Sequence, residues 1–321
     1  MRSLLTLAIL LVACTTPTNI DDAGTDADID ASVDAAHAPR MDAGHDVGTD
    51  AGPRCEPVDG GTIMACNGHA ALCGRRYDEV AYATTHNAMS SEEGRFTGPN
   101  QHFALWRQME DGVRGLMLDV HAAADGTVSL CHANCRLGGF PLVDGLRDIR
   151  AFLDCHPAEV ITIIFESYVP ESDIASAFTT TNLIAYVHAQ ATGASWPTLR
   201  EMIATNERLV VFTADSARTL PWHMNTYDYA WENPYSAATP SDLSCAQDRG
   251  SRARSLWVFN HFLTNPIASP ALAELINHDP FFQTRVDGCR ADASGDLPNF
   301  VTVDFYDIGD VLHVVDTLNG L

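Results

Sequence analysis

Eight short apolar runs, most of them separated by segments with helical apolar spacing, constrain the fold of this 321-residue chain more than any other feature. The runs cover residues 80–87, 114–119, 127–131, 160–166, 208–213, 229–233, 256–261 and 300–306. Strands that alternate with helices build a parallel sheet, and eight of them favour a (β/α)8 barrel of the TIM type. The run at 127–131 follows 114–119 too closely for a full helix between them, so we expect a distorted α/β barrel. An open doubly wound sheet is the alternative, but no glycine-rich phosphate-binding loop follows the first run.

Polar or titratable residues stand at the carboxyl ends of four of these runs. They are His86 with Asn87, Asp119, His132 and Glu166. In a parallel barrel these ends meet on one face, where barrel enzymes build their active sites. Two histidines suit a general base and a general acid, and amide and carboxylate oxygens suit Ca²⁺. Together the groups match the needs of phosphodiester cleavage, although each taken singly also has a structural interpretation, as a hydrogen-bonding, helix-capping or ion-paired residue.

The last run ends near Asp304, which has two readings. Its carboxylate can orient His86, as the third member of a catalytic triad does, or it can bond a loop amide. Aromatic residues raise a similar choice between substrate pocket and core, and these are Trp231, Trp257 and Tyr306.

The N-terminus has the pattern of an export signal. Arg2 precedes an apolar stretch from Leu4 to Ala13, which is too short to span a membrane. Cys14 follows directly, and this ending resembles the lipobox of bacterial lipoproteins, where the cysteine is lipidated; an ordinary signal peptide cleaved near Ala13 is the alternative. We therefore expect export with lipid anchoring to the bacterial cell envelope (the outer membrane), or secretion.

Domain organisation follows from a change of composition. Residues 15–54 are rich in Asp and Ala and almost lack bulky apolar residues, so we expect a disordered linker. The catalytic barrel is expected to cover 55–321. The formal net charge of -23 excludes nucleic acid as a partner, because phosphates require clustered basic residues. We expect a monomer.

Cysteine usage suggests disulfides. Without Cys14 the chain has eight cysteines, an even number that in an exported protein allows up to four disulfides. Two local pairs are candidates, namely Cys66 with Cys73 and Cys131 with Cys135. The sequence alone does not fix the pairing of the others.

Several motifs, in order, resemble the X region of phosphatidylinositol-specific phospholipase C, most of all its secreted, plant-like X-domain branch. They are Thr85–Asn87, Gln108–Asp119, Leu130–His132 and the segment 157–166, with further likeness at 208–213 and 298–306. The resemblance covers roughly residues 66–320. It implies a distorted TIM barrel and a phosphoric diester hydrolase that acts in two steps on a phospholipid.

The resemblance also implies roles for the two histidines. His86 matches the base that deprotonates the inositol 2-hydroxyl, whose oxygen then attacks phosphorus and forms a cyclic phosphate. His132 matches the group that assists the departing diacylglycerol oxygen.

The same resemblance implies a calcium site. Asn87, Asp119 and Glu166 match calcium-ligand positions of the eukaryotic enzymes, whereas metal-independent bacterial enzymes carry arginine in place of Asp119. One departure is Met117, which stands where the eukaryotic enzymes have another acidic ligand. We therefore expect Ca²⁺ to bind weakly.

Two other functions are compatible with the sequence. A glycerophosphodiester phosphodiesterase also pairs histidines beside a cation, although the acidic stretch typical of that class is missing here. A non-catalytic surface-binding protein of the same fold is the second, and Met117 is its main support. The loops at 88–101 and 214–245 carry no signature of the headgroup.

Overall fold

The computed structural model of the chain describes residues 64–214 and 219–321. The signal peptide and the linker predicted at 1–54, including Cys14, lie outside the described residues, as does the start of the predicted barrel at 55–63. Among the helices that are described, none is both long and apolar enough to cross a bilayer.

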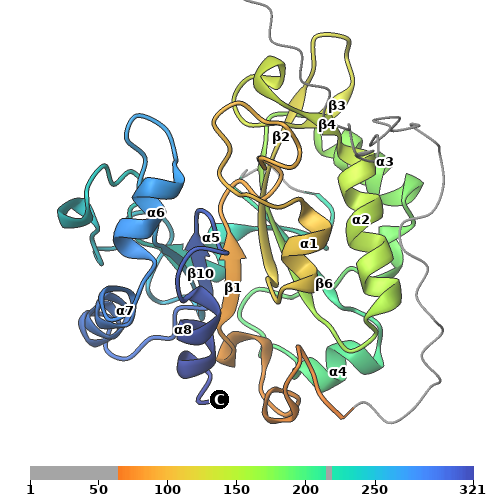
Figure 1. Ribbon diagram of the computed structural model, residues 1–321. Coiled ribbons are helices and arrows are strands. Elements are labelled where there is room, and N and C mark those ends of the chain that lie inside the picture. The colour runs from red at the N-terminus through yellow and green to blue at the C-terminus, as the bar shows by residue number, and fades with distance from the viewer. Residues whose placement is uncertain (1–63, 215–218) are drawn as a thin grey trace, which may run out of the picture. The chain divides into compact units, whose positions relative to one another are not determined.

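One curled sheet organises the described residues (Figure 1). Eight strands follow one another in the order β7-β6-β5-β2-β1-β10-β9-β8, and every neighbouring pair is parallel. Their bounds are β1 Tyr82–Thr85, β2 Gly115–Ala122, β5 Ile161–Ser167, β6 Leu209–Thr213, β7 His223–Asn225, β8 Ala230–Glu232, β9 Leu256–Asn260 and β10 Phe300–Val303. This arrangement confirms the prediction of a distorted α/β barrel.

The distortion lies at the two ends of this strand order. β7 and β8 are consecutive in the chain and are joined by the single turn of α5, Thr226–Tyr229. No pairing between them is found in the part of the chain that the structure describes. The curled sheet is therefore open at this seam, which the chain crosses through α5.

Helices flank the sheet on both sides. In Figure 1, α2 and α3 stand to the right of the strands and α6 and α7 to the left. The bounds are α1 Leu105–Glu110, α2 Leu142–Cys155, α3 Glu171–Thr180, α4 Leu199–Ala204, α6 Pro270–Ile276, α7 Phe281–Asp292 and α8 Val311–Leu318. Short 3-10 helices are η1 Ala70–Leu72, η2 Tyr77–Glu79, η3 Cys135–Leu137, η4 Leu183–Ala185 and η5 Pro240–Asp242.

The apolar run at 127–131 is not a barrel strand, and this corrects the sequence prediction. It forms β3, Val128–Leu130, which pairs antiparallel with β2 and with β4, Phe140–Pro141. A tight turn around Asp125 and Gly126 reverses the chain after β2, so no crossover can bring β3 back parallel. The eighth place in the barrel belongs to β7 instead.

The core explains why these segments become strands and helices. The first four residues of β5, Ile161–Ile164, are all buried, as expected of a strand covered on both faces. Helix α2 buries one apolar face with Leu142, Leu146, Ile149 and Leu153. The interior of the barrel thus holds the carboxyl ends of its strands in fixed positions.

Disulfides add covalent links among the described residues. Cys66 pairs with Cys73 and Cys131 with Cys135, which confirms both local candidates. Cys245 in the β8–β9 connection pairs with Cys289 in α7.

Candidate active site

A cavity of about 350 Å³ opens at the carboxyl ends of the barrel strands. Of the six residues that the sequence analysis assigned to strand ends, four line it, and the other two, His132 and Asp304, hydrogen-bond to lining residues. His86, Asn87, Asp119 and Glu166 line the cavity directly. Their gathering follows from the parallel sheet, because strand ends that are distant in sequence become neighbours on one face.

His86 is held from three sides at the end of β1. Its Nδ1 lies 2.9 Å from Oδ1 of Asp304, the residue that follows β10. The same oxygen accepts a hydrogen bond of 2.9 Å from the Nδ2 of Asn100. The imidazole also stacks on Phe262, with the ring centres 3.9 Å apart. Asp304 therefore contacts both the histidine and a loop amide, so the geometry is compatible with either reading of this residue.

His132 has a carboxylate partner of its own. Its Nδ1 lies 2.8 Å from Oδ2 of Asp119, which is buried in the second half of β2. The hydrogen bond to Asp119 raises the pKa of His132, against a smaller opposing effect of burial. Because Nδ1 is taken by Asp119, the Nε2 of His132 is the nitrogen left to exchange a proton with a ligand.

The Asn87 carboxamide lies between the two histidines and is close to both. One terminal atom of its carboxamide lies 3.3 Å from Nε2 of His86 and 3.2 Å from Nδ1 of His132. The other lies 3.2 and 3.3 Å from the two oxygens of Asp119. If the amide nitrogen of Asn87 faces Asp119, it donates hydrogen bonds to the carboxylate and no cation is required. If the amide oxygen faces Asp119, this oxygen and the two carboxylate oxygens repel one another unless a cation lies between them.

The predicted metal ligands have suitable chemistry but are few. Asp119 and Glu166 are register partners on β2 and β5, and Asn87 adds a third oxygen nearby. Two of these groups already have partners, since His132 bonds Asp119 and the hydroxyl of Tyr168 donates to Glu166. No cluster of three or more His, Cys, Asp or Glu arranged to hold a metal occurs in residues 64–214 and 219–321.

Met117 faces the same cavity. It lies two positions before Asp119 on β2, so the strand's alternation puts both side chains on one face. A thioether is a poor ligand for Ca²⁺, which takes oxygen donors. The donor set is thus hard and oxygen-based, which fits Ca²⁺ in kind, and it lacks one carboxylate.

The far wall of the cavity was missed in the sequence. Glu232, at the end of β8, is buried and forms an ion pair with Arg249. Burial raises the pKa of Glu232, while the hydrogen bond from Arg249 opposes the rise. The Arg249 guanidinium lies over the rings of Tyr227 and Tyr235, at 5.3 and 4.6 Å. The strand was predicted as the run at 229–233, but Glu232 at its end was given no role in the site. Tyr235 and Arg249 come from the loop that follows, which carries no periodic pattern.

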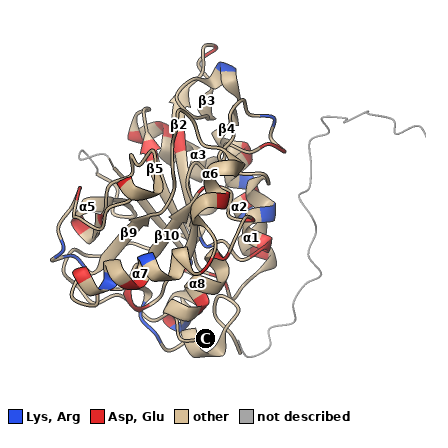
Figure 2. Ribbon diagram, turned by 60° about the vertical axis from the view of Figure 1, so that its left-hand side comes forward, with Lys and Arg blue, Asp and Glu red and all other residues tan. Residues whose placement is uncertain are grey.

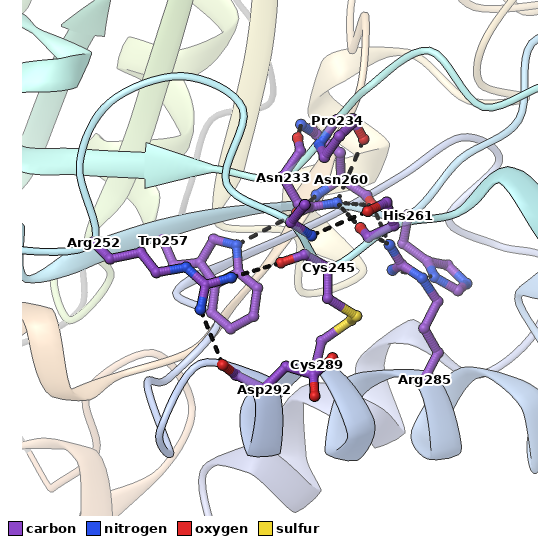
Figure 3. Close-up of a disulfide and its surroundings, with 12 residues drawn as sticks. Asn233, Pro234, Cys245, Arg252, Trp257, Asn260, His261, Arg285, Cys289 and Asp292 are labelled. Carbon is purple, nitrogen blue, oxygen red and sulfur yellow. Dashed lines mark hydrogen bonds between the residues drawn. A yellow bond between two sulfur atoms is a disulfide. The ribbon is translucent and has the colours of Figure 1, made fainter.

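The β8–β9 connection, which contributes to this wall, is linked to α7 by a disulfide (Figure 3). The Cys245–Cys289 disulfide ties it to α7, and Arg252 donates a 2.8 Å hydrogen bond to the carbonyl of Cys245. The same connection between β8 and β9 supplies Tyr235 and Arg249 to the cavity. The disulfide therefore supports the cavity wall without touching the histidines.

A third histidine, near the Cys245–Cys289 disulfide, has a structural role. His261, which lies beside Arg285 in Figure 3, is fully buried and stacks on Phe282, with the ring centres 3.8 Å apart. Burial, and next the charge of Arg285, lower the pKa of His261 well below its usual value. Its neutral ring bonds the carbonyl of Ile276 through Nε2 and accepts from Arg285 through Nδ1, both at 3.0 Å.

The three aromatic residues considered for a substrate pocket belong to the core. Trp231 and Trp257 are buried and stack with ring centres 4.2 Å apart. Tyr306 is buried and donates its hydroxyl hydrogen bond to Asp111. None of the three lines the cavity described above.

The cavity is acidic. Figure 2 shows Asp and Glu positions near the labelled ends of β2 and β5. Among the described lining residues, Arg249 is the sole lysine or arginine, and Glu232 neutralises it. The whole sequence lacks lysine, so its 19 basic residues are all arginines.

Comparison with known proteins identifies relatives over most of the described chain. The family model PI-PLC X 1 matches residues 72–319. A PI-PLC X domain-containing protein 1 of Arthroderma benhamiae is 31% identical over 288 residues, covering 80% of this chain and 90% of that protein. A PI-PLC X domain-containing protein of Arabidopsis thaliana is 29% identical over 273 residues, which span 77% of this chain and 63% of its own length.

A further Arthroderma benhamiae protein, described as secreted, is 26% identical and covers 77% of this chain and 61% of itself. Among solved structures, the fold is similar to a mutant phosphatidylinositol-specific phospholipase C from Staphylococcus aureus. The TM-score is 0.56 at 15% identity, with 76% of this chain and 94% of that chain covered. At this identity the likeness concerns the fold.

Proposed function

Because this chain belongs to the PI-PLC X family, we propose that it is an exported phosphoric diester hydrolase of the phosphatidylinositol-specific phospholipase C type. The observation that carries the proposal is the pair of His–Asp dyads, His86–Asp304 and His132–Asp119, that flank Asn87 at one cavity. Phosphodiester cleavage needs one group to accept a proton and another to give one, and two separately oriented histidines meet that need.

In the first step, Nε2 of His86 takes the proton of a headgroup hydroxyl. The freed oxygen forms a bond to phosphorus, while the bond from phosphorus to the diacylglycerol oxygen breaks. His132, as the imidazolium, donates a proton from Nε2 to that leaving oxygen. The products are a cyclic phosphodiester and diacylglycerol; water then opens the ring with the two histidines in exchanged roles.

The carboxylates keep each histidine in a useful state. Asp304 fixes the proton of His86 on Nδ1, so that Nε2 presents its lone pair to the substrate. Asp119 stabilises the imidazolium of His132, whose raised pKa keeps the proton available. Ca²⁺, when held by Asn87, Asp119 and Glu166, would neutralise phosphoryl charge.

The charge of the cavity bears on the substrate. A headgroup with further phosphate groups would need several cations, and the described lining offers only Arg249, already paired with Glu232. We therefore expect a headgroup without additional phosphates, bound through hydroxyl groups. Phosphatidylinositol and glycosylated inositol lipids meet this condition.

The location of the protein is part of the proposal. The N-terminal pattern that ends at Cys14 favours export and lipid anchoring to the cell envelope, which would bring the active site to a membrane. A relative that is described as secreted supports export. The partners are then the lipid substrate and the membrane, with the protein as a monomer.

The test is headgroup release from vesicles of phosphatidylinositol, with and without excess chelator. Wild-type protein should release headgroup, while His86→Ala and His132→Ala should lower the rate by about 10²–10⁴-fold with unchanged thermal unfolding. Full activity in excess chelator would show that the reaction does not require Ca²⁺. Full activity in either variant would refute the histidine mechanism.

A non-catalytic binding protein remains the second candidate, and Met117 in the ligand set favours it. It predicts that calorimetry detects headgroup binding while no product forms. The glycerophosphodiesterase alternative lacks support, since the matching family model is PI-PLC X 1.

A further inference from the structure

The two histidines of the site are positioned by different means. His86 is packed between Phe262 and the Asp304–Asn100 pair, and its side chain is 21% exposed. His132 is 52% exposed, and its recorded side-chain contacts are to Asp119 and Asn87. Because the His132 side chain is half exposed, packing around it cannot fix its position, and the position of its backbone must be fixed by neighbouring residues.

A small covalent ring surrounds His132. Cys131, which directly follows β3, is fully buried and forms a disulfide with Cys135 four residues later. His132, Ala133 and Asn134 lie between the two cysteines and are all exposed. The ring thus anchors an exposed segment to the core through a single buried residue.

The anchor is joined directly to the partner of His132. The backbone N–H of Cys131 donates to the carbonyl of Asp119 at 3.2 Å, while the Asp119 side chain bonds His132. Within the ring, the N–H of Asn134 donates to the carbonyl of His132 at 2.5 Å. Ala133 has φ of 55°, a left-handed conformation that costs free energy for a residue with a side chain and that a closed ring can hold.

The chain that leaves the ring is packed closely against it. A Cβ placed on Gly139 would lie 3.0 Å from the Cβ of Cys131 and 3.2 Å from the carbonyl of Leu130. Thr97 in the β1–α1 loop donates to the carbonyl of Leu137 at 2.6 Å. These contacts pack the ring and the segment after it against neighbouring chain, with His132 next to Asp119.

We propose that the Cys131–Cys135 disulfide is the positioning device of His132, and that opening it selectively slows protonation of the leaving group. The inference rests on the proposed function, in which His132 gives a proton to the leaving oxygen. Opening by a dithiol transfers two electrons and two protons to the two sulfurs, yields two thiols, and leaves the reductant as a disulfide. His86 and Asp304 are outside the ring, so activation of the nucleophile stays intact.

This selectivity can be measured with two leaving groups on the same headgroup. An alkoxide needs a proton to depart, whereas a nitrophenolate departs without one. Misplacement of His132 therefore lowers the cleavage rate of the alkyl ester and leaves that of the aryl ester nearly unchanged. A general loosening of the barrel would slow both.

The experiment compares Cys131→Ser/Cys135→Ser with Cys66→Ser/Cys73→Ser. The second ring is also short, seven residues apart, and lies at the amino end of β5, where Asn67 inside it bonds the backbone of Val160. Turnover of an alkyl and a nitrophenyl inositol phosphodiester is measured for both variants and for wild type. We expect the first variant to lose about 30-fold or more on the alkyl ester and no more than about threefold on the aryl ester; the control should lose no more than about threefold on either.

An equal loss on both esters, or no loss on the alkyl ester, overturns the proposal. If the double variant fails to show native near-UV circular dichroism, wild type is reduced with a dithiol instead, and mass mapping identifies the opened bond; the same two rates then decide. Failure of wild type to turn over both esters would count against the proposed function, and it is thereby distinguishable from failure of the positioning role.

Discussion

Replacing Asp304 by asparagine isolates the charge that supports His86. The carboxylate is buried, and its Oδ1 accepts from both His86 and Asn100 at 2.9 Å. An amide oxygen at the same place would keep both contacts, so Asp304→Asn removes charge with little change of shape. When His86 takes a proton, its imidazolium and this carboxylate form an ion pair.

The size of the effect follows from that pair. Two unit charges roughly 4 Å apart attract by about 4 kcal/mol at the effective dielectric constant of a protein site. If the transition state carries most of this charge, its loss lowers kcat by about a thousandfold, since each tenfold corresponds to about 1.4 kcal/mol. Comparable replacements in catalytic triads cost about 10⁴.

Asp307→Asn is the matched control. It belongs to a second dyad, in which Nδ1 of His102 lies 2.7 Å from Oδ2 of Asp307, three residues after Asp304. Neither member lines the cavity. Its turnover should stay within about threefold of wild type, because it supports no reacting group.

The assay is initial headgroup release from phosphatidylinositol vesicles at saturating substrate, with thermal unfolding of each variant measured alongside. A loss of less than about tenfold for Asp304→Asn in a folded protein would refute the role given to the carboxylate. Equal losses in both variants would point to a general electrostatic effect instead.

Three further predictions concern calcium, pH and stability. Met117→Glu supplies the missing carboxylate and should tighten Ca²⁺ binding by about tenfold, measured by calorimetry; unchanged affinity would exclude this position from the site. Asp119 raises the pKa of His132, so the pair should stabilise the fold below the unfolded-state pKa of histidine and lose that contribution as pH rises through the folded pKa. In calcium-free buffer, Asp119→Asn should therefore shift the NMR titration of His132 to lower pH, and an unshifted titration would contradict the assignment. Removing the Cys245–Cys289 disulfide, which spans 44 residues, should cost about 4 kcal/mol in denaturant unfolding, and a loss below about 1 kcal/mol would show that the segment is held by its other contacts.

Strands with a continuous apolar run could be predicted from the sequence, as at 160–166 and 300–306. The strand β7 could not, because His223–Asn225 is three residues long and has no β-branched residue. Helix α7 was also missed, since it buries only Phe282, Val286 and Cys289 and its remaining side chains are mostly polar. Short or polar elements owe their structure to tertiary contacts that no local pattern records.

The residues of the site also divide into those that a local sequence pattern predicts and those placed by tertiary contacts. His86 was found because it directly follows a parallel strand. His132 was expected at the end of a barrel strand, and it instead follows an antiparallel hairpin that returns to Asp119. Asn100 and Arg249 come from loops, whose path is set by packing rather than by periodicity.

In the proposed mechanism, His86 and His132 cleave a phosphodiester through attack by the substrate's own hydroxyl. Phosphorus NMR of phosphatidylinositol vesicles during the first turnovers distinguishes this route from attack by water. A cyclic phosphodiester should accumulate before any monoester, and no such product should form with His86→Ala. A monoester formed from the first turnover, or no phosphorus-containing product from wild type with and without Ca²⁺, would contradict it.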